Sequence, residues 1–238
     1  VDLDDLEERV LRGHWSPALL MHRLEILASR RRALAIAEWS LVCSDLDRRR
    51  LGHHSRVAVL ANTYLVTERP VQPITSGGSS EVVAVVGSMG YDPNREGVEW
   101  FVSRCWASVR SCRPAAHLRL VGKSGHVLAG IESEGVVVID STADIVEVLE
   151  DVTVFAVPIF RGSGTRVKIL EAMALGKPVV STRLGAEGLE VTDGVDIVLR
   201  DDAEEFADAV ATLLAQPELA EKIGAAGNAL FNERYAID

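Results

Sequence analysis

One stretch of the chain, PIFRGSGTRVKILEAMALGKPVVST at 158–182, concentrates residues that could bind an anion. Its pattern predicts a strand that ends at Pro158 and a helix that starts near Thr165. The loop between them holds Gly162 and Gly164. Glycine lets a backbone approach a ligand closely, and the first turn of a helix presents unpaired N–H groups at the positive end of its dipole. This junction therefore predicts a phosphate site.

Three charged side chains follow this loop: Arg166, Lys168 and Glu171. Lys168 and Glu171 are three residues apart, so they share one face of the helix. A carboxylate accepts two hydroxyl hydrogen bonds, and a ribose offers two neighbouring hydroxyls. Taken singly, the pair could be a surface contact worth about 0.3 kcal/mol, and the glycines could serve only a tight turn. Their conjunction at one strand-to-helix junction favours a site for a nucleoside diphosphate.

Other short motifs in the chain do not carry a function. GKS at 122–124 resembles the end of a P-loop, but that motif needs glycine at position 117, which is His117. The GSGTRV segment lacks the third glycine of the dinucleotide fingerprint. No spacing of cysteine and histidine resembles a zinc site, so we expect no metal.

Six short apolar runs alternate with helical patterns after residue 80, which predicts an α/β fold with a doubly wound parallel six-stranded sheet. Ligands of such sheets bind at the carboxyl ends of the strands. The expected strands are 81–87, 117–122, 136–140, 152–158, 178–182 and 195–200. One helix is expected to start near Asn94. Further helices are expected over 125–132, 145–149, 165–175, 202–214 and 217–235.

Residues 1–75 have a different pattern. A long arginine-rich helix is expected over 17–37, followed by apolar runs at 39–44 and 57–62. Two such runs do not make a stable sheet alone, so the segment is expected to be an incomplete second α/β unit. PVQPITSGGSS at 70–80 is the clearest linker. The predicted domains are therefore 1–75 and 76–238.

Composition excludes several classes of protein. The chain has 238 residues with 25 Lys and Arg against 35 Asp and Glu, a net charge of −10, whereas a nucleic-acid binder needs a basic face. Apolar residues make up 47% and charged residues 25%, the mix of a globular protein. No apolar run is long enough to span a membrane, and the opening VDLDDLEERV is no secretory leader, so a cytoplasmic location is expected.

The stretch 82–235 resembles the donor-binding C-terminal domain of a GT-B glycosyltransferase of family 4 (group 1), a Rossmann-like domain. The resemblance rests on VVGSMGYDPNREGVEWF, LRLVGK, FAVPIFRGSGTRVKILEAMALGKPVVSTRLGAEGL and the closing NERY. The third of these motifs is the most specific. The upstream segments VDLDDLE, SLVCSDLDRRRL and VAVLANTY resemble the last third of the family's N-terminal, acceptor-side domain.

The resemblance implies a hexosyltransferase-type enzyme that transfers a sugar from a nucleotide-sugar donor to an acceptor, with retention in most members. The expected partners are a UDP- or GDP-sugar and a glycan, lipid or small-molecule acceptor, with no nucleic acid, no cofactor and no metal. The chain is expected to be a truncated form that holds mainly the donor site and transfers little sugar alone. Peripheral membrane association would come through the missing N-terminal part.

The family's motifs assign roles to single residues. Glu171 matches the second glutamate of the family's E-x7-E motif and would bind ribose, while Ser163 stands where the first glutamate is usual. In the family, an arginine and a lysine after the first strand usually hold the diphosphate, and Met89 and Asn94 stand near those positions here. Because both cations are missing there, Arg166 and Lys168 are expected to supply the positive charge. The catalytic residue is thus unknown. The predicted donor-binding residues are Gly87, Asn94, Gly162, Ser163, Gly164, Thr165, Arg166, Lys168 and Glu171.

The nucleobase is expected at the ends of the second and third strands, near Lys123, Ser141, Thr142 and Ala143. Two other functions stay open at this point. One is a non-catalytic nucleotide-sugar-binding protein derived from a glycosyltransferase, which the serine at 163 favours. The other is a fragment of a dehydrogenase, although the segment 87–90 after the first strand lacks the glycine spacing of that class.

Overall fold

The structure is a computed structural model that describes residues 17–51, 56–60, 62, 81–128, 130–131, 133–140, 148–162 and 167–236. The chain divides into two compact units. Residues 1–62 with the short segments 161–166 and 187–190 form one unit, and all other residues form the second. The predicted boundary at residues 75 and 76 lies outside the described residues and stays a prediction.

The first unit contains a long helix and two short strands. Its elements are α1 (Pro17–Ile36), β1 (Ser40–Val42), α2 (Asp45–Leu51) and β2 (Val57–Val59). The two strands pair in parallel, with Ser40 opposite Val57. Val42 and Leu51 form a small buried cluster. The helix predicted over 17–37 and the two apolar runs are thus found in the structure.

Helix α2 was not expected from the apolar pattern, because it is too short and too polar to show one. Its start nevertheless carries a recognisable signal, a serine followed three residues later by an acidic residue. The Ser44 hydroxyl donates to the Asp47 carboxylate at 2.5 Å, and the Asp47 N–H donates back to Ser44 Oγ at 3.1 Å. These reciprocal bonds satisfy an N–H group that the helix start leaves without a partner.

The second unit is built on a six-stranded parallel sheet with the order β5-β4-β3-β6-β7-β8. The predicted α/β fold and the six parallel strands are confirmed. The strands are β3 (Val82–Val86), β4 (His117–Val121), β5 (Val136–Ile139), β6 (Val154–Val157), β7 (Val179–Ser181) and β8 (Val198–Leu199). The helices are α3 (Asp92–Phe101), η2 (Val102–Trp106), α4 (Ala107–Cys112), η3 (Gly125–Leu128), α6 (Val167–Ala174), α7 (Ala203–Ala215) and α8 (Pro217–Arg234).

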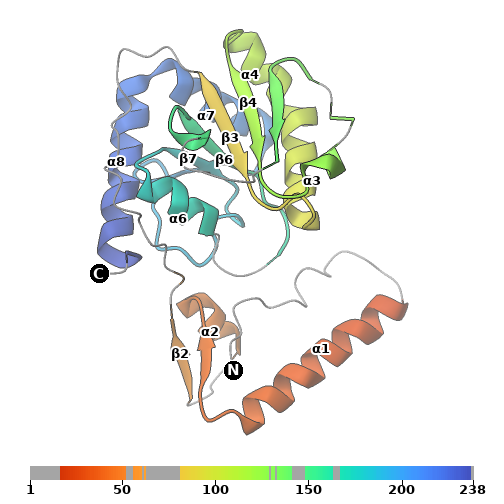
Figure 1. The fold of residues 1–238 in the computed structure, drawn as a ribbon. Coiled ribbons are helices and arrows are strands. Elements are labelled where there is room, and N and C mark those ends of the chain that lie inside the picture. Colours follow the sequence, from red (N-terminus) through yellow and green to blue (C-terminus); the bar gives the residue numbers. More distant parts are fainter. Residues whose placement is uncertain are drawn as a thin grey trace. The chain divides into compact units, whose positions relative to one another are not determined.

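Both faces of the sheet are covered by helices, which is why its strands read as continuous apolar runs. All five residues of β3 are buried. Side chains of alternate strand residues, such as Val83 and Val85, join one core together with residues of α3, α4 and α7. In Figure 1 the yellow-green α3 and α4 lie on one side of the strands, and α6 lies with α8 on the other.

Some boundaries differ from the prediction. The strand expected over 195–200 is only Val198–Leu199, because Asp196 closes a tight loop by accepting from the Thr192 N–H at 2.8 Å. The helix expected over 125–132 is a short 3-10 turn, η3. Part of the expected helix 145–149 and the start of the helix expected over 165–175 lie outside the described residues. In the parts of the chain that the structure describes, no helix is both long and apolar enough to cross a membrane.

Candidate functional site

The strand order reverses between β3 and β6, which lie side by side although β4 and β5 come between them in sequence. One half of the sheet continues from β3 to β4 and β5, and the other from β6 to β7 and β8. At such a switch point the loops after the two strands diverge and leave a crevice at the carboxyl ends. Ligands of doubly wound sheets bind there, so this edge is the candidate site.

Gly87 makes the turn directly after β3. Its N–H donates to the Val121 carbonyl at 2.9 Å, which keeps the turn against the end of β4. A Cβ atom at Gly87 would lie 2.8 Å from Asn94 Nδ2 and 2.9 Å from Lys168 Nζ. A side chain at this position would displace the ends of both side chains from the turn, and the positive φ of 154° also favours glycine. The glycine therefore lets two polar side chains come close to the backbone at the switch point.

Lys168 and Asn94 meet above this turn. Lys168 Nζ donates to Asn94 Oδ1 at 2.7 Å, and Asn94 Nδ2 donates to the Ser88 carbonyl at 2.9 Å. Asn94 lies in the first turn of α3, and Lys168 lies in the described part of α6. A cation is thus held beside the start of α3, where the positive end of the helix dipole also favours an anion.

Glu171 lies one turn further along α6 and is half-buried. Burial raises the pKa of Glu171, and the positive charge of Lys168 lowers it in part. The charges of Lys168 and Glu171 therefore interact, in keeping with their spacing of three residues along one helix. A partly desolvated carboxylate is a strong acceptor for hydroxyl groups, since water competes less for its oxygens.

Helix α3 packs very closely against the end of β6 at Gly97. A Cβ atom there would overlap the carbonyl oxygen of Pro158. The close approach holds α3 against the residue that directly follows β6. Gly162, further along the chain, is buried and has a positive φ of 112°. This φ is one that residues other than glycine rarely adopt.

The other predicted site residues fall into two groups. Lys123 is exposed on the turn after β4, and its backbone carbonyl accepts from the Met89 N–H at 2.8 Å. The remaining ones lie outside the described residues, and their roles stay predictions: Ser141, Thr142, Ala143, Ser163, Gly164, Thr165 and Arg166. Among the side chains that the structure describes, no group of three or more His, Cys, Asp or Glu residues could hold a metal ion.

The sequence did not predict that Asn94 holds Lys168 or that Gly97 sits on Pro158. The first contact joins residues 74 positions apart, and no local pattern indicates it. The second left a signal. A glycine in a helix interior costs about 1 kcal/mol relative to alanine, so a glycine within the pattern NREGVEWF suggests close packing.

Comparison with known proteins identifies one family and several similar folds. Residues 80–216 match the family described as glycosyl transferases group 1. A Klebsiella pneumoniae protein, described as an uncharacterized 44.6 kDa protein in the cps region, is 24% identical over 135 residues. That match covers 52% of this chain and 35% of the Klebsiella protein.

Solved structures share the fold at low sequence identity. WaaG, a glycosyltransferase involved in lipopolysaccharide biosynthesis, aligns with a TM-score of 0.77 and 17% identity over 98% of this chain and 70% of WaaG. Anabaena Alr3699/HepE, solved with UDP and glucose, aligns with a TM-score of 0.66 and 18% identity. That alignment covers 99% of this chain and 67% of Alr3699/HepE. A mutant of S. aureus TarM, solved in complex with UDP, aligns with a TM-score of 0.72 and 14% identity. That alignment covers 89% of this chain and 44% of TarM.

Proposed function

Since the chain belongs to the glycosyl transferases group 1, we propose that it binds a nucleotide-sugar donor at the switch point and transfers the sugar to an acceptor. The observation that carries the proposal is the Lys168 ammonium, which is held by Asn94 beside the Gly87 turn. In this site the ammonium contacts the diphosphate, and Glu171 accepts hydrogen bonds from the ribose hydroxyls. Because Gly87 carries no side chain, the backbone of this turn can approach a phosphate that the ammonium contacts.

The same arrangement suits the chemistry of transfer. The bond between the anomeric carbon and the diphosphate oxygen breaks, an acceptor hydroxyl oxygen bonds to that carbon and gives up its proton to the leaving diphosphate or to solvent, and the diphosphate gains negative charge as it leaves. A fixed cation and the N–H groups at the start of α3 stabilise that charge in the transition state without reorganising. Arg166 supplies a second positive charge in this proposal. Transfer proceeds with retention, and no metal takes part.

The donor is proposed to be a UDP- or GDP-sugar. The structures of Alr3699/HepE and TarM contain UDP, which supports a uridine nucleotide as the first ligand to test. The base is proposed to lie near Lys123 and the segment 141–143. A hexose as the sugar, a glycan, lipid or small molecule as the acceptor, and a cytoplasmic location stay predictions of the sequence.

The direct test is a titration of the chain with UDP, GDP and NAD, followed by calorimetry and by the melting temperature. A ligand that binds only the folded state raises the melting temperature, by an amount that grows with its concentration relative to Kd. We expect stabilisation by UDP or GDP and none by NAD. Stabilisation by NAD alone would instead indicate a dehydrogenase-type cofactor domain.

A second candidate function is a protein that binds the nucleotide sugar but does not cleave it. Ser163 favours it, because the family's usual carboxylate beside the donor sugar is missing there. Release of nucleoside diphosphate from a bound UDP-sugar separates the two functions. Release above the uncatalysed rate supports the transferase, and tight binding without any release supports the binding protein only when an acceptor-side domain is also present.

Asn94→Ala tests whether Asn94 acts through Lys168. The substitution removes the acceptor that holds the ammonium, so we expect UDP binding to weaken by about fivefold, the value of one ordinary hydrogen bond. In a Lys168→Met background the same substitution should have almost no effect, because the group it positions is gone. The four proteins are compared by calorimetry. Additive losses in the double variant would mean that Asn94 contacts the ligand independently.

Glu171→Gln should stabilise the free protein at neutral pH and weaken the complex. A glutamate whose pKa burial raises destabilises the folded state once it ionises, so its favourable contribution exists below its ordinary pKa of about 4.3 and is lost as the pH rises through the folded pKa. The variant should therefore melt above the wild type at pH 7, and the difference should shrink toward pH 4. UDP affinity should fall about tenfold, because an amide is a weaker acceptor than a carboxylate.

The matched control for this change is Glu221→Gln, which neutralises an exposed glutamate on α8. It should alter neither the melting temperature at pH 7 nor the affinity for UDP. If Glu171→Gln left UDP binding intact, Glu171 would not hold the ribose. If Glu171→Gln did not raise the melting temperature, burial of the ionised carboxylate would not be destabilising the folded protein.

A further inference from the structure

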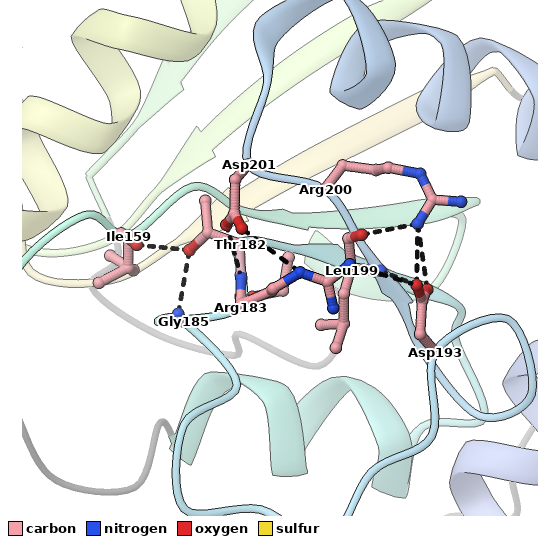
Figure 2. A network of polar contacts seen from close by, with 9 residues as sticks. Ile159, Thr182, Arg183, Gly185, Asp193, Leu199, Arg200 and Asp201 are labelled. Carbon is pink, nitrogen blue, oxygen red and sulfur yellow. Dashed lines mark hydrogen bonds and ion pairs between the residues drawn. The ribbon is translucent and has the colours of Figure 1, made fainter.

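The hydroxyl groups of Thr182 and Ser181 join the carboxyl end of β7 to the end of β6 and the residues that follow it. Thr182 follows β7 and is fully buried. Its Oγ1 donates to the Ile159 carbonyl and accepts from the Gly185 N–H at 2.9 Å, as Figure 2 shows. The hydroxyl thus donates its single proton to the chain that leaves β6, and one of its lone pairs accepts from the loop that follows β7.

The loop after β7 is seated closely on these strand ends. Ser181, also fully buried, places its Oγ 3.2 Å from the Val157 carbonyl and 2.9 Å from the Thr182 carbonyl. A Cβ atom at Gly185 would overlap Ser181 Oγ and lie 3.0 Å from the Val157 carbonyl oxygen, so a larger residue there would force these atoms to move. Contacts at the strand ends therefore leave this loop little freedom.

A second set of polar contacts holds the same loop from β8. The Arg183 N–H donates to Asp201 Oδ1 at 2.9 Å. Asp193 accepts from the Leu199 N–H at 2.9 Å and from the Arg200 guanidinium at 3.1 Å. Figure 2 shows both sets of contacts, which meet where Arg183 follows Thr182 in the chain. Thr182 contacts Ile159, two residues past the end of β6, and Ser181 contacts Val157, the last residue of β6.

We propose that Thr182 is a positioning residue for the donor site, whose hydroxyl fixes the chain at Ile159, directly after the Pro158 carbonyl against which Gly97 of α3 packs. The inference rests on the proposed function, because α3 also carries Asn94, which holds the Lys168 ammonium there. Ile159, whose carbonyl Thr182 holds, is itself buried. Without the hydroxyl, a buried carbonyl and a buried N–H lose their partner, and the loop must shift to find another.

Thr182→Val and Thr182→Ser separate the hydroxyl from the shape of the side chain. Valine has nearly the shape of threonine but cannot donate or accept, so we expect UDP to bind about tenfold more weakly. Serine keeps the hydroxyl and should bind UDP within about threefold of the wild type. Affinity is measured by calorimetry well below the melting temperature of each variant, so that loss of folded protein does not enter the result.

Thr153→Val is the matched control, because Thr153 is a buried threonine just before β6, at the opposite end of that strand. It should change the melting temperature without changing UDP affinity. A merely structural Thr182 would behave in the same way. Unchanged UDP affinity in Thr182→Val, together with a lower melting temperature, would therefore overturn the proposal.

Two further outcomes are distinguishable. If the valine variant does not fold, Thr182→Cys replaces it, since a thiol of similar size is a weak donor, and the same loss of affinity is expected. If the wild-type chain binds no nucleoside diphosphate, the proposed function fails and not the role of Thr182 alone. Binding by the wild type with equal binding by the valine or cysteine variant contradicts only the positioning role.

Discussion

Replacing Lys168 by methionine should weaken the binding of UDP or GDP by roughly 10- to 100-fold, because hydrogen bonds to charged groups contribute about 1.5–3 kcal/mol. Methionine keeps the unbranched stem of lysine and removes only the ammonium. That ammonium lies at the switch point of the sheet, bonded to Asn94 and beside the Gly87 turn. The measurement is calorimetric titration at fixed ionic strength, since added salt screens charge pairs.

The control is Lys222→Met, which makes the same change at an exposed position on α8. Both variants lose one positive charge, so any effect of net charge on a polyanionic ligand appears in both. Only the Lys168 variant should lose affinity substantially. Arg166→Ala completes the test of the proposal that two cations replace those the family usually carries after the first strand. Unchanged affinity in Lys168→Met and Arg166→Ala would refute it.

Gly97→Ala should destabilise the sheet unit by about 3 kcal/mol, at the upper end of the usual cost of overpacking a core. For a chain of this length such a loss lowers the melting temperature by about 6–12 °C. The reason is that the added Cβ would overlap the Pro158 carbonyl oxygen, which belongs to the backbone and cannot turn away as a side chain can. Helix α3 must then move off the end of β6.

Thermal denaturation followed by circular dichroism measures this loss. Gly90→Ala is the matched control, because the nearest atom to its added Cβ is Ser124 Oγ at 3.3 Å, the end of a side chain that can rotate. We expect its melting temperature to stay close to that of the wild type. A Gly97→Ala protein as stable as the control would show that α3 and β6 do not pack as closely as the structure has them.

The sequence predicted the architecture well because the relevant signals are local. Buried parallel strands need apolar side chains on both faces, and this requirement leaves runs such as VVAVV that end at a glycine. The candidate phosphate loop was found for the same reason, since its glycines, Lys168 and Glu171 lie within one short segment. The signals failed where the turn chemistry was polar, as at the start of α2 and at Asp196 before β8.

The contacts that assemble the site have a different origin. Lys168 meets Asn94, Gly97 meets Pro158, and Thr182 meets Ile159, each pair joining elements that come together only in the folded sheet. Strand order and register bring them together, because β3 pairs with β6 and β6 with β7. The kinds of elements were thus readable from residue types and spacing, while the class of ligand stays a prediction. The partners of each site residue were not readable, since they depend on which strands become neighbours.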